Sequence, residues 1–203
     1  KRLQSRVLGL GYYDPSVGKS ALIAQVKDSP GQIISSNEIL YADAFSGADA
    51  AVRYTYKKSG LAQDVILIKQ PPPPADFGFN PETTRLQVLT EFVDTAAPTL
   101  KTATATPTAD ELANQTLSFG EMYMAQGKAF AVGPSNVSKA KATVAKRWVE
   151  TQGRSILVEE VQLDRIKAAL QTLPAPIRTA SLGTRLSPML AQADFCLPEA
   201  GPA

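Results

Sequence analysis

The segment that most resembles a functional motif is Gly18-Lys19-Ser20, which matches the last three positions of a Walker A phosphate-binding loop. That pattern begins with glycine, and Tyr13 occupies the position here. The loop has to wrap backbone N–H groups around phosphates and begin a helix at the lysine. Residues 21–27, however, form an apolar run that is equally typical of a strand. We therefore predict a β-turn at Gly18-Lys19-Ser20, with no bound nucleotide.

Three acidic residues could supply a carboxylate pair of the glycosidase kind: Glu121, Glu159 and Glu160. Adjacent residues of a strand face opposite ways, so Glu159 and Glu160 reach one site only if a bulge intervenes. We expect these side chains to form a solvated rim. A carboxylate-dependent hydrolase stays open as one hypothesis, and it requires two acidic groups about 5 to 9.5 Å apart across a cleft.

Other catalytic and metal chemistries are restricted by composition. The chain has no histidine, which excludes Ser-His-Asp, Cys-His and histidine-metal sites. Cys196 is the single cysteine, so there is no thiolate metal cluster and no disulfide framework. Asp43, Ser46-Gly47 and Asp49 could bind calcium, but their spacing matches no EF-hand and we expect a turn. We predict no catalytic residue, no cofactor and no metal.

Four aromatic residues on predicted strands could present a flat surface to sugar rings or to a partner protein: Tyr54, Tyr56, Tyr123 and Trp148. Core packing is the alternative for each of them. Trp148 shares its strand face with Lys146 and Glu150, so we expect it on the wetter side. A carbohydrate-binding module requires Trp148 and at least one tyrosine to be exposed and roughly coplanar.

The elements that position these residues are predicted to be mainly strands. Residues 7–13 and 21–27 form one hairpin, and Val52, Tyr54 and Tyr56 alternate with polar residues as a half-buried strand requires. The other predicted strands and hairpins are 33–34, 39–45, 65–68 covered on both faces, 85–93, 117–124 with 128–132, and 144–150 with 155–161. We expect antiparallel hairpins that form a sandwich-like or barrel-like core.

A single short helix is predicted in the C-terminal half. Leu163, Ile166, Leu170 and Leu173 recur at offsets of three and four, and Pro174 ends the pattern. The domain prediction is a β-rich domain at 1–94, hairpins plus this helix at 111–187, and a tail or linker at 188–203. The Thr/Ala/Pro-rich stretch 95–110 is either a linker between two domains or a long loop within one.

Charge and hydropathy restrict the partners. A formal charge of +2 gives no reason to expect nucleic-acid binding. No apolar run approaches the ~20 residues that cross a bilayer, so we expect no membrane insertion. The chain begins at Lys1-Arg2 without an initiating methionine and ends in Pro198–Ala203, so we expect a piece of a longer, exported protein.

Three stretches of the chain together resemble a known family of proteins. They are residues 40–67, 80–92 and 146–160, including Leu40-Tyr-Ala-Asp-Ala-Phe-Ser-Gly and Lys146-Arg-Trp-Val-Glu-Thr-Gln-Gly-Arg. They resemble the non-repetitive β-rich region of very large exported bacterial proteins with RHS or YD-type repeats. The resemblance implies a secreted or cell-surface location and a structural or interaction role. Our first functional hypothesis is therefore a non-catalytic module that contacts other modules of the same polypeptide or another protein.

Overall fold

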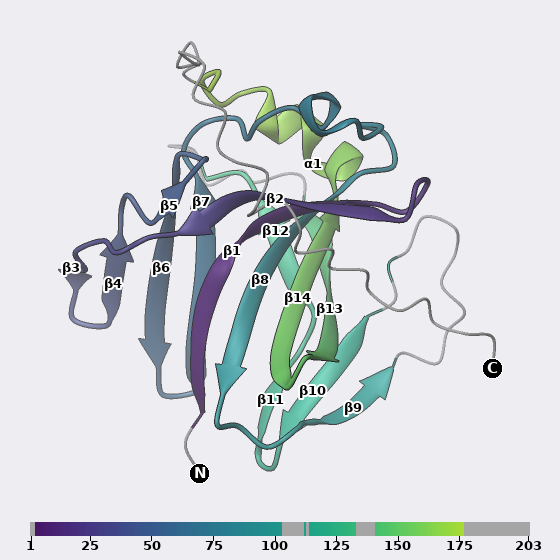
Figure 1. Ribbon diagram of the computed structural model, residues 1–203. Coiled ribbons are helices and arrows are strands. Elements are labelled where there is room, and N and C mark those ends of the chain that lie inside the picture. The colour runs from purple at the N-terminus through teal and green to yellow at the C-terminus, as the bar shows by residue number, and fades with distance from the viewer. Residues whose placement is uncertain (1–2, 103–111, 113, 133–140, 177–203) are drawn as a thin grey trace.

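A computed structural model describes residues 3–102, 112, 114–132 and 141–176 (Figure 1). Strands predominate in it and form antiparallel sheets that curve into a half-barrel. The α-helix in this described part, α1 (Leu163–Leu170), lies near its C-terminal end. The predicted fold class, mainly β with one short helix in the C-terminal half, is confirmed.

The largest sheet has seven strands, and β8 (Arg85–Val93) is the central one. In spatial order they are β12 (Gly127–Phe130), β13 (Lys141–Thr151), β14 (Arg154–Gln162), β8, β1 (Gln4–Asp14), β2 (Lys19–Val26) and β5 (Phe45–Ser46). Strand β8 pairs with β1 on one edge and with β14 on the other. Strands from 1–94 and from 111–187 therefore share one sheet, which favours the long-loop alternative for the stretch between them.

Two smaller sheets complete the β structure. The first has the order β3 (Gln32–Ser35), β4 (Glu38–Tyr41), β6 (Ala50–Lys57) and β7 (Gly60–Leu67), and the second has the order β11 (Met122–Met124), β10 (Gln115–Phe119) and β9 (Thr99–Thr102). Strand β9 lies within the stretch predicted as a linker or loop, so that stretch contains regular structure.

Both small sheets contribute to the core on one face of the large sheet. Strand β8 turns Leu86, Thr90 and Phe92 to this face because alternate residues share a side. Leu86 packs in a buried cluster with β1, β2, β6 and α1, whereas Phe92 packs in a second cluster with β10, β13 and β14. Between the two clusters Gln63 of β7 donates a hydrogen bond to Thr90, 3.2 Å between Nε2 and Oγ1.

Helix α1 forms where the sequence pattern predicts it. Leu163 is buried, and Ile166 and Leu170 pack against the first cluster at helical offsets of three and four. Asp164 in the first turn has the charge that a helix N-terminus favours. The helix ends at Leu170, one turn earlier than the predicted Leu173.

The Gly18-Lys19-Ser20 segment has the predicted hairpin geometry. Gly18 adopts a left-handed φ of 63° in the turn, and Lys19 and Ser20 are the first residues of β2. Ser20 pairs with Tyr13 across the antiparallel ladder. The strand–loop–helix arrangement of a phosphate-binding loop is therefore not formed here. The predicted hairpin without a helix at Lys19 is confirmed, but the turn itself is Pro15–Gly18, so its predicted position at Gly18-Lys19-Ser20 was two to three residues too late.

Two local predictions were wrong. Residues 117–132 do not form one hairpin about Ala125–Gly127: β10 pairs with β11 across a turn at Gly120, whose φ is 76°, and β12 pairs with β13 instead. The run 65–68 is not covered on both faces either, because its first three side chains are only half-buried and Ile68 is exposed. The positions of the glycines did not show which strands pair, and a continuous apolar run did not show whether both faces of a strand are covered.

A buried carboxylate fastens the tip of the β1–β2 hairpin to the loop before β8. Asp14 is fully buried, and its Oδ1 accepts hydrogen bonds from Ser16 N at 3.0 Å, Ser16 Oγ at 2.7 Å and Thr83 Oγ1 at 2.7 Å. Its Oδ2 accepts one from Asn80 N at 2.8 Å. Burial acts to raise the pKa of Asp14, but these four hydrogen bonds outweigh it and lower the pKa to about 2.

This carboxylate generates a stability prediction. Asp14→Asn places an amide donor among groups that are themselves donors, so we expect the free energy of unfolding to fall by about 2 kcal/mol, measured by urea denaturation at pH 7. Asp28→Asn, which changes an exposed aspartate, is the matched control and should leave stability unchanged. Equal stability of both variants would contradict the account.

Ionisation of Asp14 should also make the free energy of unfolding depend on pH. A folded pKa below the unfolded value of 3.8 adds stability above about pH 4, and that stability is lost as the pH falls toward 2. The stability difference between wild type and Asp14→Asn should therefore shrink over this window in urea titrations. A difference that stays constant from pH 5 to pH 2 would show that ionised Asp14 is not the group responsible.

Candidate functional site

The candidate functional site is an exposed apolar surface on the four-stranded sheet, which we call the apolar patch. It consists of Ile33, Ile39, Tyr56 and Leu61. Ile33 is directly opposite Ile39, and Tyr56 is directly opposite Leu61, so these side chains stand on the same face of the sheet. Ile33 is 80% exposed, Leu61 68% and Tyr56 64%, which is unusual for large apolar side chains so close together.

The apolar patch continues the face that forms the core. Along β6, Val52 is buried in the first cluster, Tyr54 is partly buried against it, and Tyr56 is exposed. All three point the same way because they alternate along the strand. Burial raises the pKa of the Tyr54 phenol, and the neighbouring Tyr41, whose ring lies 6.1 Å away, raises it further. The sheet therefore extends beyond the core with its apolar face uncovered.

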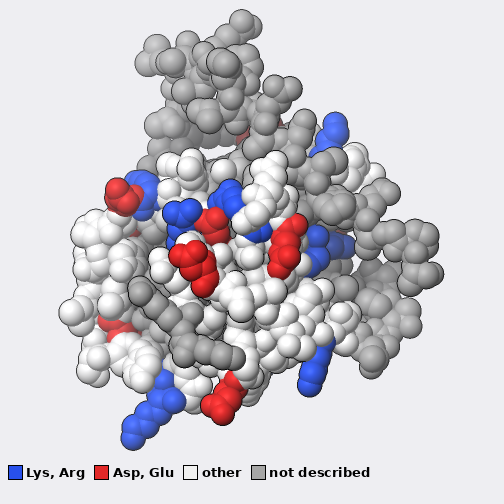
Figure 2. Space-filling model, turned by 60° about the horizontal axis from the view of Figure 1, so that its bottom comes forward, with Lys and Arg blue, Asp and Glu red and all other residues white. Residues whose placement is uncertain are grey.

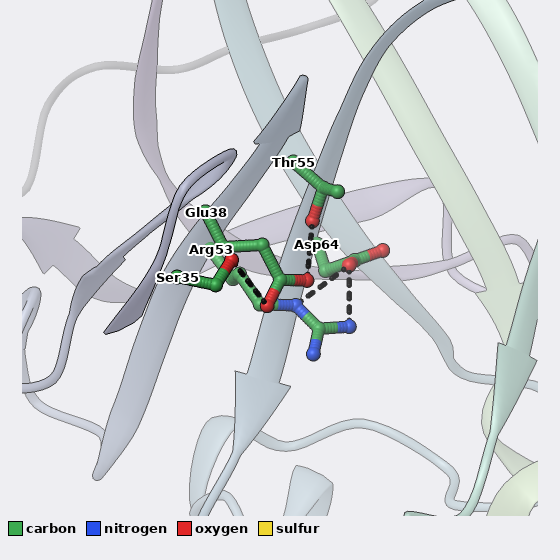
Figure 3. A network of polar contacts seen from close by, with 5 residues as sticks. All are labelled: Ser35, Glu38, Arg53, Thr55 and Asp64. Atoms are coloured by element: carbon green, nitrogen blue, oxygen red, sulfur yellow. Dashed lines mark hydrogen bonds and ion pairs between the residues drawn. The ribbon is translucent and has the colours of Figure 1, made fainter. Parts of the chain in front are cut away.

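The opposite face of the same sheet is polar and internally paired (Figure 3). Arg53 donates two hydrogen bonds to Oδ2 of Asp64, from Nε at 3.1 Å and from Nη2 at 2.8 Å. Thr55 donates to Glu38 Oε1 at 3.1 Å. Cross-strand pairs of this kind fix the register of β4, β6 and β7, so the apolar patch is presented by a sheet of defined alignment.

The four aromatic residues predicted as a surface do not lie together. Tyr54 and Tyr56 belong to the four-stranded sheet, whereas Tyr123, also exposed, belongs to β11 of the three-stranded sheet. Trp148 lies on β13 of the large sheet and is buried. Of these four aromatic residues, only Tyr56 is an exposed member of the apolar patch.

Trp148 was predicted on the wetter side of its strand, and this was wrong. Its ring packs in the second cluster, with centroids 5.1 Å from Phe92 and 5.8 Å from Phe119. Strand β12 pairs with β13 only over residues 141–144, and β10 lies alongside the rest, where Gln115 Oε1 accepts from Trp148 N at 2.8 Å. This covering strand comes from a distant part of the chain, so the alternation within β13 could not reveal it.

A core role for Trp148 predicts a large loss of stability on truncation. Trp148→Ala should lower the free energy of unfolding by about 3 to 5 kcal/mol in urea denaturation, because it opens a cavity between Phe92 and Phe119. Tyr123→Ala removes an exposed aromatic side chain and should cost less than about 0.5 kcal/mol. If both variants were equally stable, Trp148 would not be a core residue.

The three candidate glutamates do not face one another. Glu159 forms an ion pair with Lys146 at 3.2 Å, and Glu160, on the opposite face of β14, forms one with Arg85 at 3.0 Å. Glu121 lies exposed at the β10–β11 turn. The predicted opposition of Glu159 and Glu160 is therefore observed, and they do not form the facing pair that the hydrolase hypothesis requires. The expected solvated rim was wrong for Glu160, which is buried and accepts hydrogen bonds from Arg85 and Gln87.

The residues considered for calcium are engaged with lysines. Asp43 accepts a hydrogen bond from Lys27 at 2.7 Å, and Asp49 forms an ion pair with Lys69. Gly47 has a left-handed φ of 92°, in keeping with the predicted turn. Among the residues that the structure describes, no group of three or more acidic or cysteine side chains could hold a metal ion.

Charged side chains of both signs are interspersed on the face shown in Figure 2, where basic and acidic groups lie side by side near its centre. Within the described ranges, no helix has the length and apolar character needed to cross a membrane. Cys196 and the tail 188–203 lie outside the described residues.

Comparisons of the chain with family models, with curated proteins and with solved structures found no match.

Proposed function

We propose that this protein is a non-catalytic structural or interaction module of a larger secreted or surface-exposed bacterial protein. The observation that supports this proposal is the apolar patch, an exposed continuation of the core face on a sheet whose other face is polar. Water-exposed apolar side chains clustered in this way are typical of surfaces that pack against another protein. The partner surface is an apolar face of another module of the same polypeptide, or of a second protein.

The exported location rests on the resemblance of residues 40–67, 80–92 and 146–160 to the non-repetitive region of RHS-type proteins. An absence of disulfides and a near-neutral charge are compatible with that location.

Carbohydrate binding is a weaker proposal. A sugar platform built on Trp148 would require that side chain to leave the second cluster. Tyr56 alone offers one exposed ring within the apolar patch, where sugar rings and apolar protein surfaces would compete for the same contacts.

Site-specific photocrosslinking tests the interaction role. A photoreactive phenylalanine analogue at position 56 of the full-length parent protein should crosslink to a defined segment of a neighbouring module or partner. The same analogue at Lys57, which points to the other face of β6, is the matched control and should not. Mass spectrometry of the crosslinked peptides identifies the contact, and equal yields at both positions would overturn the proposal.

The exported location is tested on intact cells that produce the full-length parent protein. A protease added to intact cells should remove the chain while a cytoplasmic marker survives. Survival of both would contradict the exported location without bearing on the apolar patch.

A further inference from the structure

The face of the large sheet that points away from the core carries a groove of about 720 Å³, which we call the outer groove. Its apolar lining includes Leu22 of β2, Leu89 of β8, and Val149, Ile156 and Val158 of β13 and β14. Gly11 of β1, a buried residue between β2 and β8, also lines it. A groove of this volume with a mostly apolar lining is typical of small-molecule sites.

Two arginines lie at one end of the outer groove and share a single carboxylate. Glu91 Oε2 accepts from Arg6 Nε at 2.6 Å, and Glu91 Oε1 accepts from Arg154 Nε at 2.6 Å. The Glu91 side chain is buried, whereas those of Arg6 and Arg154 are 66% and 39% exposed. The hydrogen bond from Arg154 lowers the pKa of Glu91 against the effect of burial, and Arg6 lowers it further. The cluster therefore carries one excess positive charge.

Within the described part of the chain, the two guanidinium groups have donors left for a second acceptor. Arg6 uses Nε and Nη2 on Glu91, and Arg154 uses Nε. Among the described residues, no hydrogen bond engages Nη1 of Arg6 or either terminal nitrogen of Arg154. Guanidinium groups bind carboxylates through such paired N–H donors, so an anionic head group complements this end.

The remainder of the outer groove favours a hydrocarbon over a peptide. Its floor is the face of a sheet in which β1, β8 and β14 are paired on both edges, so their backbone N–H and C=O groups are already used. A peptide laid on this face would bury amide groups without partners, at a cost that an aliphatic chain avoids.

We propose that the outer groove binds an aliphatic carboxylate of the fatty-acid type. Its carboxylate is held by Arg6 and Arg154, and its chain lies over Leu22, Leu89 and Val149, which are exposed or half-buried, whereas Ile156 and Val158 lie buried beneath. This site is separate from the apolar patch, which lies on another sheet.

Isothermal titration calorimetry of the intact chain with dodecanoate, below its micelle concentration, tests the proposal. We expect saturable binding of one dodecanoate per chain, and at least about tenfold weaker binding of dodecyltrimethylammonium, which has the same chain and the opposite charge. Absence of saturable dodecanoate binding overturns the proposal, as does equal affinity for the two amphiphiles.

Three variants locate the site. Arg6→Gln should weaken dodecanoate binding about tenfold and leave dodecyltrimethylammonium unaffected. Leu22→Asp, an exposed groove position away from the arginines, should weaken both amphiphiles. Lys57→Gln, an exposed lysine of the four-stranded sheet, is the control and should change neither.

Circular dichroism confirms folding of each variant before titration. Equal effects of Arg6→Gln and Lys57→Gln would place any binding elsewhere and overturn the assignment. Tighter binding of an apolar peptide with a free carboxyl terminus than of dodecanoate would assign the outer groove to a protein segment and would also overturn it.

Discussion

The structure depends on the pairing of β8 along both of its edges. Its nine residues bond to β1 on one side and to β14 on the other, over sequence separations of more than 60 residues in each case. Closing such distant contacts costs chain entropy, which the burial of the core face has to offset. The two halves of the described chain are thereby joined in one sheet.

Alternation along β8 then assigns a separate role to each of its faces. Thr90 and Phe92 point to the core, where Thr90 meets the four-stranded sheet and Phe92 meets the three-stranded sheet. Leu89 and Glu91 point the other way, into the outer groove and its arginine cluster. Glu91 is buried, and losing both arginines would leave an uncompensated charge there, so this cluster also constrains how β1, β8 and β14 align.

Local patterns predicted much of this arrangement. The range 85–93 corresponds to β8 residue for residue, and the hairpin about Gln152-Gly153 forms a tight turn in which both residues have positive φ. The sequence predicted that Gly18-Lys19-Ser20 does not form a phosphate-binding loop, because a glycine is missing and strand-like residues follow. These two local features were enough to predict the outcome.

What could not be predicted were the long-range contacts. Trp148 shares its face with charged residues, but β10 covers that face, and Lys146 is buried there with its Nζ bonded to the Ala125 carbonyl at 2.7 Å. The outer groove was also missed, because Arg6 and Arg154 lie 85 and 63 positions from Glu91. One available signal was Glu91 itself, a carboxylate directly before the apolar residues Phe92 and Val93 in the strand Arg85–Val93.

We infer that β8 makes the described chain one cooperative unit. Native-state hydrogen exchange, followed residue by residue in increasing denaturant, tests it most directly. If β8 unites the sheet in this way, the slowest amides of β1, β8 and β14 should exchange with one shared free energy, equal to that of global unfolding. Separate free energies for the β1–β2 and β13–β14 hairpins, with β8 following only one of them, would contradict it.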